Sequence, residues 1–172
     1  MPERSQGSVR SWVGTVVFLV VAPGVVAGLV PWLISGWREP ALWGPPALIW
    51  VVSAVLILPG VWLLLDAFAR FARASGTPAP VAPTQHLVVV GPYRFVRNPM
   101  YIAVVAIILG QAVLFGNWFV ALWAVVVALA VALFVYGYEQ PTLAREYGDE
   151  YARYCANVRA WIPRLRPWEP RS

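Results

Sequence analysis

The sequence predicts an all-α polytopic membrane protein with four transmembrane helices and a cytoplasmic amphipathic C-terminal helix. Hydrophobic residues fill 60% of the 172 positions and charged residues only 12%, whereas soluble domains carry about 25% charged residues. Four apolar runs are long enough to cross a bilayer, which takes roughly 20 residues. Only short polar segments separate most of these runs, so residues 1–172 are expected to form a single membrane domain.

The predicted spans cover residues 12–34, 47–68, 99–115 and 118–138. The first is too long for a signal peptide and lacks a cleavage-site pattern. Pro23-Gly24 and Pro59-Gly60 are expected to kink or bend the first two spans. Gly116-Asn117 predicts a tight turn, which makes the last two spans an antiparallel hairpin. Gln111, within the third span, is expected to hydrogen-bond between helices.

The distribution of arginine predicts the orientation. Two arginines precede the first span, four lie in the loop 70–98 and six in the tail 139–172, whereas the loop 36–40 has one and the turn 116–117 none. Cytoplasmic loops carry the excess of positive charge. Both termini, the loop 70–98 and the tail are therefore predicted to be cytoplasmic.

Several classes of partner and chemistry are disfavoured. The net charge is +5, but no basic helix or arginine run points to nucleic acid, and anionic lipid headgroups are the simpler partner. One cysteine, Cys155, and one histidine, His86, predict neither a disulfide framework nor a metal site. The sequence has no phosphate loop, Rossmann glycine pattern, HExxH or GxSxG.

The stretch 91–101 is polar and cationic, and it lies between two apolar segments. It holds two tyrosines, two arginines and an asparagine: Tyr93, Arg94, Arg97, Asn98 and Tyr101. Asn98-Pro99 predicts a helix start, since Asn is a preferred N-cap and Pro a preferred first residue. The stretch is therefore expected at the boundary between water and lipid.

Glu139-Gln140 follows the last span on the same predicted face. Arginine binds carboxylates, glutamate binds ammonium or ribose hydroxyls, and asparagine reads a base edge. S-adenosylmethionine carries all of these groups, although a protein that binds lipid headgroups would show the same residues.

Other local patterns predict supporting structure. Leu143, Tyr147 and Tyr151 recur at helical spacing in an amphipathic helix that Gly148 is expected to break. Asp66 and Arg70, four residues apart, favour an ion pair over a site carboxylate. The proline-rich segment 73–86 favours an extended loop, either a linker or a lid, and residues 87–90 favour an extended segment against the bundle.

Two blocks of the chain match known motifs. Leu87-Val-Val-Val-Gly-Pro-Tyr-Arg-Phe-Val-Arg-Asn-Pro-Met-Tyr101 is similar to LVxxGPYRxxRHPxY. Glu139-Gln-Pro-Thr-Leu143, Tyr147-Gly-Asp-Glu-Tyr-Ala-Arg-Tyr154 and Ile162-Pro163 are similar to EExxLxxxFGxxYxxY followed by IP. Over residues 70–165 the chain thus resembles the isoprenylcysteine carboxyl methyltransferase and phospholipid methyltransferase superfamily, and residues 76–80 look like the loop of a bacterial subgroup.

The resemblance implies a methyltransferase in a bacterial cytoplasmic membrane that uses S-adenosylmethionine for O- or N-methylation of a lipid or lipophilic small molecule. It implies catalytic roles for Arg97 and Glu139. Carried over by position, the cofactor-binding residues are Leu87, Val88, Gly91, Tyr93, Asn98, Tyr101, Glu139, Gln140, Ile162 and Pro163.

Three positions depart from the motifs. Asn98 replaces a histidine, which keeps a donor and an acceptor but excludes acid–base work, and Gln140 replaces a second glutamate. Val135 stands where many members carry an arginine suited to a substrate carboxylate, so a neutral or amine substrate is favoured.

Two other functions stay open at this point. Sterol reductases share a related membrane core, and NADPH binding would identify that class. The departures from the motifs also allow a non-catalytic four-helix protein that binds lipid, which would tolerate the loss of Arg97 and Glu139.

Overall fold

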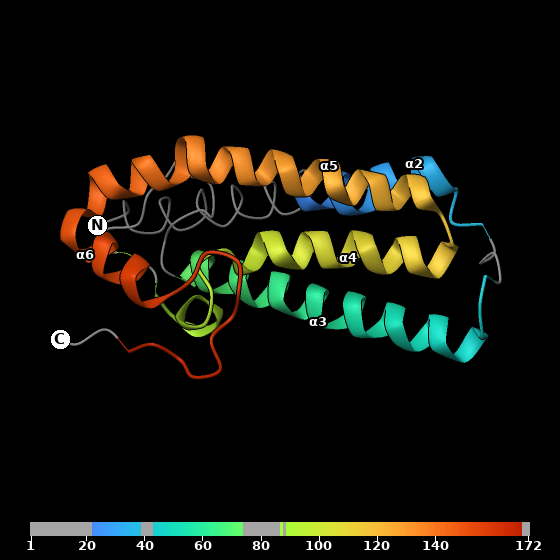
Figure 1. Cartoon of the computed structure of the whole chain (residues 1–172), viewed down its shortest axis with the longest axis horizontal. Helices are drawn as coiled ribbons and strands as arrows, with labels where there is room; N and C mark the ends of the chain where they lie inside the picture. The colour runs from blue at the N-terminus through green and yellow to red at the C-terminus, as the bar shows by residue number, and fades with distance from the viewer. Residues whose placement is uncertain (1–21, 39–42, 74–86, 88, 170–172) are drawn as a thin grey trace, which may run out of the picture.

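The computed structural model of the protein describes residues 22–38, 43–73, 87 and 89–169 (Figure 1). Within these ranges all regular secondary structure is helical, which confirms the all-α class. The elements are the π-helix η1 (Val25–Leu29), α2 (Val30–Ser35), α3 (Pro46–Arg73), the 3₁₀-helix η2 (Gly91–Arg94), α4 (Pro99–Phe115), α5 (Trp118–Phe134), the π-helix η3 (Val135–Glu139) and α6 (Gln140–Asn157).

Helix α4 is the centre of the bundle and packs against α3 and α5 (Figure 1). Gly60 and Gly110 let α3 and α4 approach closely. A Cβ added at Gly60 would lie 2.9 Å from Cγ1 of Ile107, and one added at Gly110 would lie 2.5 Å from Cγ1 of Ile57. Small residues at helix contacts are typical of membrane bundles, where packing drives association.

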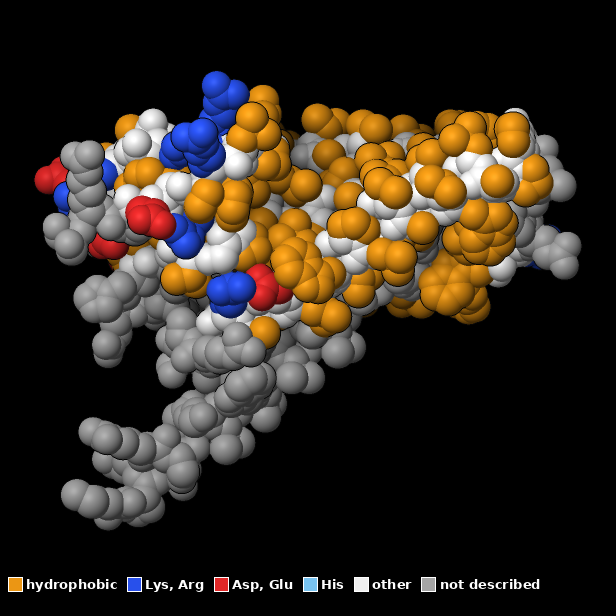
Figure 2. All heavy atoms as spheres, turned by 90° about the horizontal axis from the view of Figure 1, so that it is seen from below, with side chains coloured by type: hydrophobic (Ala, Val, Ile, Leu, Met, Phe, Trp, Pro, Cys, Tyr) orange, Lys and Arg blue, Asp and Glu red, His pale blue; other side chains and the backbone are white. Residues whose placement is uncertain are grey.

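The outer faces of the bundle are apolar. Leu58, Trp62 and Leu133 are 67%, 65% and 74% exposed, and Figure 2 shows hydrophobic side chains along the bundle with charged ones gathered at one end. Pro46–Arg70 and Trp118–Asn157 are long and apolar enough to cross a bilayer, and Ala22–Ser35 and Pro99–Phe115 are shorter apolar helices. These apolar faces and helices fit the predicted membrane protein, and the count of four spans stays a prediction.

The predicted spans agree with the helices to different extents. The span 99–115 coincides with α4, whereas 47–68 lies inside α3, which continues through Pro59 to Arg73. The span 118–138 does not end in a turn, because α5, η3 and α6 follow one another without a break. Residues 12–21 of the first span and 74–86 of the proline-rich loop lie outside the described residues.

The predicted turn at Gly116-Asn117 is confirmed. Gly116, at φ 57°, ends α4, and the side chain of Asn117 accepts hydrogen bonds from the amides of Phe119 and Val120 in the first turn of α5. The π-helix η1 begins directly after Pro23-Gly24, and the kinks expected there and at Pro59-Gly60 stay predictions. Gln111 donates to the carbonyl of Ala27 at 2.6 Å, which confirms its role between helices.

Helix α6 turns back at the end of the bundle (Figure 1). Gly148 interrupts it with φ 47° and ψ −121°, a conformation that glycine adopts with little strain. The predicted break at Gly148 is confirmed. The reversal brings residues after 148 against the segment that precedes α4.

Candidate active site

A strap formed by residues 158–169 runs along the segment that precedes α4. The amide of Arg97 donates to the carbonyl of Arg159 at 3.0 Å, that of Arg164 to Phe95 at 2.9 Å, and that of Trp168 to Arg94 at 2.9 Å. Arg94 also pairs with Glu169, at 2.6 Å. These bonds join the two sequence blocks at the charged end of the bundle.

A small polar cavity lies where the two blocks meet. Its volume is about 20 Å³, and its lining residues are Arg97, Asn98, Val135, Glu139, Gln140, Leu143, Tyr151 and Tyr154. A space of this size holds about one water molecule. Four residues expected at the site from sequence, Arg97, Asn98, Glu139 and Gln140, thus share one cavity.

Two donors at this cavity have no hydrogen-bond partner. They are Nε of Arg97 and Nε2 of Gln140, and both atoms are buried. Another guanidinium nitrogen of Arg97, Nη1, donates to Sγ of Cys155 at 2.6 Å. A buried donor without an acceptor costs about 1–3 kcal/mol, so the arrangement favours a ligand that supplies acceptor atoms.

Glu139 is held in place by Tyr101. The Tyr101 hydroxyl donates to Oε2 of Glu139 at 2.9 Å, which joins the first turn of α4 to the end of η3. The pair lies between the polar cavity and a second, larger one.

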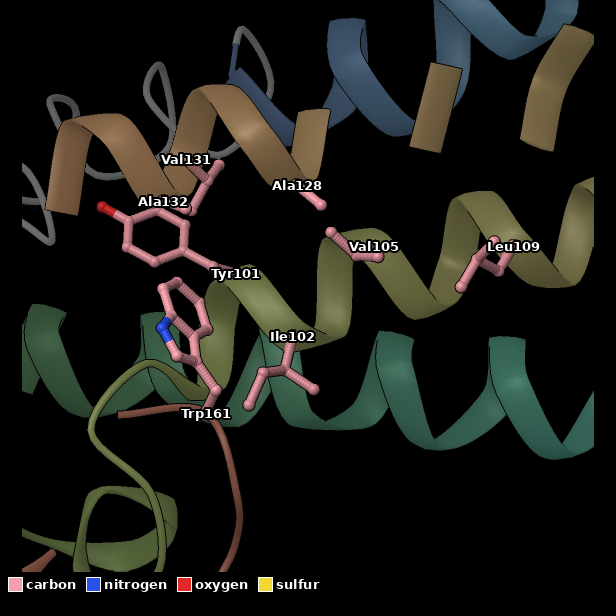
Figure 3. A pocket seen from close by; sticks show the side chains of 8 residues that line it. All are labelled: Tyr101, Ile102, Val105, Leu109, Ala128, Val131, Ala132 and Trp161. Atoms are coloured by element: carbon pink, nitrogen blue, oxygen red, sulfur yellow. The ribbon is translucent and has the colours of Figure 1, made fainter. Parts of the chain in front are cut away.

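This second, apolar cavity lies between α4 and α5 and has a volume of about 420 Å³. Figure 3 shows Tyr101 and Trp161 at one end and Leu109 at the other. The lining residues are Tyr101, Ile102, Val105, Leu109, Ala128, Val131, Ala132 and Trp161. Leu109 is 37% exposed, so the cavity reaches the apolar outer surface. The space suits a hydrocarbon group.

Asn98 occupies the predicted N-cap position of α4, which begins at Pro99 as expected. Its side chain makes no cap hydrogen bond to α4. Instead its Nδ2 donates to the carbonyl of Ala160 at 3.1 Å. Asn98 is buried at 7% exposure, and the nearest acceptor belongs to the strap, so its side chain fastens the strap to the start of α4.

Tyr93 and Gly91 lie beside the site and do not line either cavity. Tyr93 is buried in the core with Phe68 and Met100. Burial raises the pKa of the Tyr93 phenol well above its usual value, so it stays neutral. Gly91, at φ 55°, lies against the guanidinium of Arg70, which forms the predicted ion pair with Asp66 at 2.7 Å. Cofactor contacts of Tyr93 and Gly91 stay predictions.

The remaining cofactor-binding residues proposed from sequence lie at the rim or outside the described part. Leu87 packs with Val89 against Tyr151 and Tyr154, as expected for an extended segment. Ile162 is 60% exposed, and neither it nor Pro163 lines either of the two cavities described above. Val88 lies outside the described residues.

Sequence reasoning missed three contributors. Cys155 holds Arg97, Tyr154 donates to the carbonyl of Tyr93 at 2.7 Å, and Trp161 closes one end of the apolar cavity. Tyr154 belongs to the second motif, which was a usable signal. Cys155 and Trp161 have no such signal, because their positions depend on the reversal at Gly148.

A family model described as phospholipid methyltransferase matches residues 48–150, which is more than half of the chain. The match covers α3 from residue 48 onward, the first motif and Glu139-Gln140. No curated protein and no solved structure matches the chain. Among the described residues, no group of three or more His, Cys, Asp or Glu side chains could hold a metal ion.

Proposed function

Because the chain belongs to the phospholipid methyltransferase family, we propose that this membrane methyltransferase moves a methyl group from S-adenosylmethionine to a lipophilic acceptor. One observation carries the proposal. A polar cavity with two unpartnered donors adjoins an apolar cavity, and the Tyr101–Glu139 hydrogen bond lies between them. A charged methyl donor needs a polar environment and a lipophilic acceptor needs an apolar one, and the two must adjoin for methyl transfer.

The donor set of the polar cavity fits S-adenosylmethionine. Arg97 is suited to the carboxylate, since a guanidinium binds carboxylates through charge-assisted hydrogen bonds. Glu139 offers an acceptor for ammonium or ribose hydroxyls, and Nε2 of Gln140 offers a free donor. When bound, the cofactor supplies an electrophilic methyl group on a sulfonium.

The cavity must widen to admit a ligand of this size. Ligand pockets typically measure about 300–1,000 Å³, and the polar cavity measures about 20 Å³. The wall formed by Tyr151 and Tyr154 follows the non-helical Gly148. We therefore place the opening movement in residues 149–169, with the strap and the end of α6 moving together.

The acceptor is proposed to enter sideways from the bilayer, between α4 and α5, with its hydrocarbon part in the apolar cavity. Its nucleophile then lies near Tyr101, at the cytoplasmic end. Val135 lines the polar cavity where a cation for a substrate carboxylate would otherwise stand. This favours a neutral or amine headgroup. Arg97 is proposed to lie beside the reacting end, and positioning of the two reactants supplies about 7–11 kcal/mol in well-oriented reactions.

We place the protein in a bacterial cytoplasmic membrane with both termini in the cytoplasm. One described arginine, Arg38, lies in the loop at the opposite end, and the others lie at the predicted cytoplasmic end of the bundle: Arg70, Arg94, Arg97, Arg145, Arg153, Arg159, Arg164 and Arg166. This arrangement follows the positive-inside rule and gives a soluble cofactor access to the polar cavity.

Titration of the purified protein in detergent micelles with S-adenosylmethionine tests the cofactor assignment. We expect saturable heat and a rise in unfolding temperature, since ligand at 100 times its Kd stabilises a protein by about 2.7 kcal/mol. Glu139→Gln and Gln140→Leu should weaken binding. Glu146→Gln, at an exposed site on α6, is the matched control and should not.

Two results would oppose the assignment. Absence of both heat and thermal shift at millimolar cofactor contradicts it and favours a non-catalytic lipid-binding protein. Saturable binding of NADPH without binding of S-adenosylmethionine favours a reductase.

A further inference from the structure

Tyr101 belongs to both environments of the proposed site. Its ring lines the apolar cavity together with Ile102 and Ala132, and Figure 3 shows its hydroxyl at the end of the side-chain cluster away from Leu109. That hydroxyl donates to Glu139 at 2.9 Å, and Glu139 lines the polar cavity. One hydrogen bond therefore joins a residue of the apolar cavity to a residue of the polar cavity.

Among the side chains that line the apolar cavity, one carries an oxygen atom that could accept a proton from a nucleophile. This oxygen is the hydroxyl of Tyr101. The others are aliphatic except Trp161, whose Nε1 donates to the hydroxyl of Tyr136 at 2.9 Å. An indole N–H is a donor and accepts no proton. Among the described side chains that line this cavity, the Tyr101 hydroxyl is thus the one that can accept a proton.

We propose, in an inference that rests on the proposed function, that Tyr101 is a catalytic residue that takes the proton from the acceptor's nucleophile. Glu139 then receives the phenolic proton of Tyr101. The nucleophile's lone pair forms the bond to the methyl carbon. The carbon–sulfur bond of the sulfonium breaks, and its electron pair stays on sulfur. The released proton goes to Oη of Tyr101 as the phenolic proton moves to Oε2 of Glu139.

Other ionisable groups surround this pair. Arg97, Tyr151 and Tyr154 share the polar cavity with Glu139, and Tyr93 interacts electrostatically with both Tyr101 and Glu139. Asp66, on α3, is paired with Arg70. Each of these described side chains lacks the direct hydrogen bond to Tyr101 that Glu139 has, so the relay is assigned to the pair.

The test compares wild type with Tyr101→Phe and Glu139→Gln in vesicles of total bacterial lipid extract, with methyl-labelled S-adenosylmethionine at saturation and a series of pH values. Acid–base catalysis contributes about 100-fold to 10,000-fold. We expect both variants to lose at least about 100-fold in kcat at neutral pH. The deficit should narrow as pH rises, because hydroxide in solution replaces the missing base.

Cofactor affinity, measured by calorimetry, separates a proton relay from simple binding. Tyr101→Phe should keep the Kd for S-adenosylmethionine within about threefold, well under the tenfold that 1.4 kcal/mol represents. Tyr138→Phe, at a half-exposed tyrosine of η3, is the matched control and should behave as wild type.

Three outcomes would overturn the relay: Tyr101→Phe with wild-type kcat, a deficit of the same size at every pH, or a deficit explained by a weaker cofactor Kd. If wild type labels no lipid, the proposed function itself fails. If wild type labels lipid and Tyr101→Phe labels it equally well, the relay fails and the proposed function stands.

Discussion

The guanidinium of Arg97 lies 2.6 Å from Sγ of Cys155, although the two residues are 58 positions apart in the chain. The contact exists because α6 turns back at Gly148 and carries Cys155 to the segment before α4. One partner is the proposed binding group for the cofactor's carboxylate. The other is the single cysteine of the chain.

Alkylation of Cys155 should therefore weaken cofactor binding. A maleimide adduct cannot share the space beside Arg97 and would displace the guanidinium. Hydrogen bonds to charged groups contribute about 1.5–3 kcal/mol, so we expect the Kd for S-adenosylmethionine to rise about tenfold to 100-fold, measured by calorimetry after mass spectrometry shows one adduct. Cys155→Ser, treated with the same reagent, should keep its untreated affinity. An unchanged Kd in fully alkylated wild type would contradict this role of Arg97.

Gly91→Ala should destabilise the folded protein. The residue has φ 55°, and a Cβ there would collide with the guanidinium of Arg70, which is paired with Asp66. Strained backbone conformations cost about 1–3 kcal/mol. We expect a lower thermal unfolding midpoint in detergent micelles. Gly28→Ala is the control, since a Cβ at Gly28 meets nothing within 4 Å. Equal midpoints for the two variants would argue against the constraint at Gly91.

Asn98→Ala should loosen the strap. The substitution removes the bond from Nδ2 to the carbonyl of Ala160, and a buried carbonyl left unpaired costs about 1–3 kcal/mol. We expect faster tryptic cleavage within residues 158–169. Asn157→Ala removes an exposed hydrogen bond to Arg153 and should leave the cleavage rate near that of wild type. Wild-type protection in Asn98→Ala would show that the other bonds hold the strap without the Asn98 side chain.

Ala132→Leu should block the lipophilic acceptor while sparing the cofactor. Ala132 lines the apolar cavity, and added methylenes there occupy the space proposed for the hydrocarbon group. Overfilling a packed space costs about 1–3 kcal/mol, so we expect methyl transfer to fall by at least about tenfold with an unchanged Kd for S-adenosylmethionine. Ala130→Leu, on the exposed face of α5, should transfer at the wild-type rate. Full activity in Ala132→Leu would place the acceptor elsewhere.

Helix ends with local stop signals could be predicted from sequence, and the others could not. Helix α4 begins at Pro99 and ends at Phe115 as expected, because Asn98-Pro99 and Gly116 act on the adjacent residues alone. Helix α3 and the run from α5 to α6 extend beyond their predicted spans. Hydropathy predicts only the part of a helix that lies in lipid. The helix itself extends beyond that part wherever its backbone hydrogen bonds continue.

The candidate site could likewise be predicted from sequence only in part. The two motifs identified Arg97, Asn98, Glu139 and Gln140, which share one cavity. Their roles in binding and catalysis stay proposals. The motifs did not reveal that Asn98 bonds to the strap or that Trp161 lines the apolar cavity, because both depend on long-range contacts that follow the chain reversal at Gly148.

The most direct test of the central claim is transfer of labelled methyl from S-adenosylmethionine to lipid. Vesicles of total bacterial lipid extract containing wild-type protein, Glu139→Gln or Glu146→Gln are incubated with the labelled cofactor and then extracted. The account predicts label in the organic phase for wild type and Glu146→Gln, and a loss of at least about 100-fold for Glu139→Gln. No label with wild type, or equal label with Glu139→Gln, would contradict it.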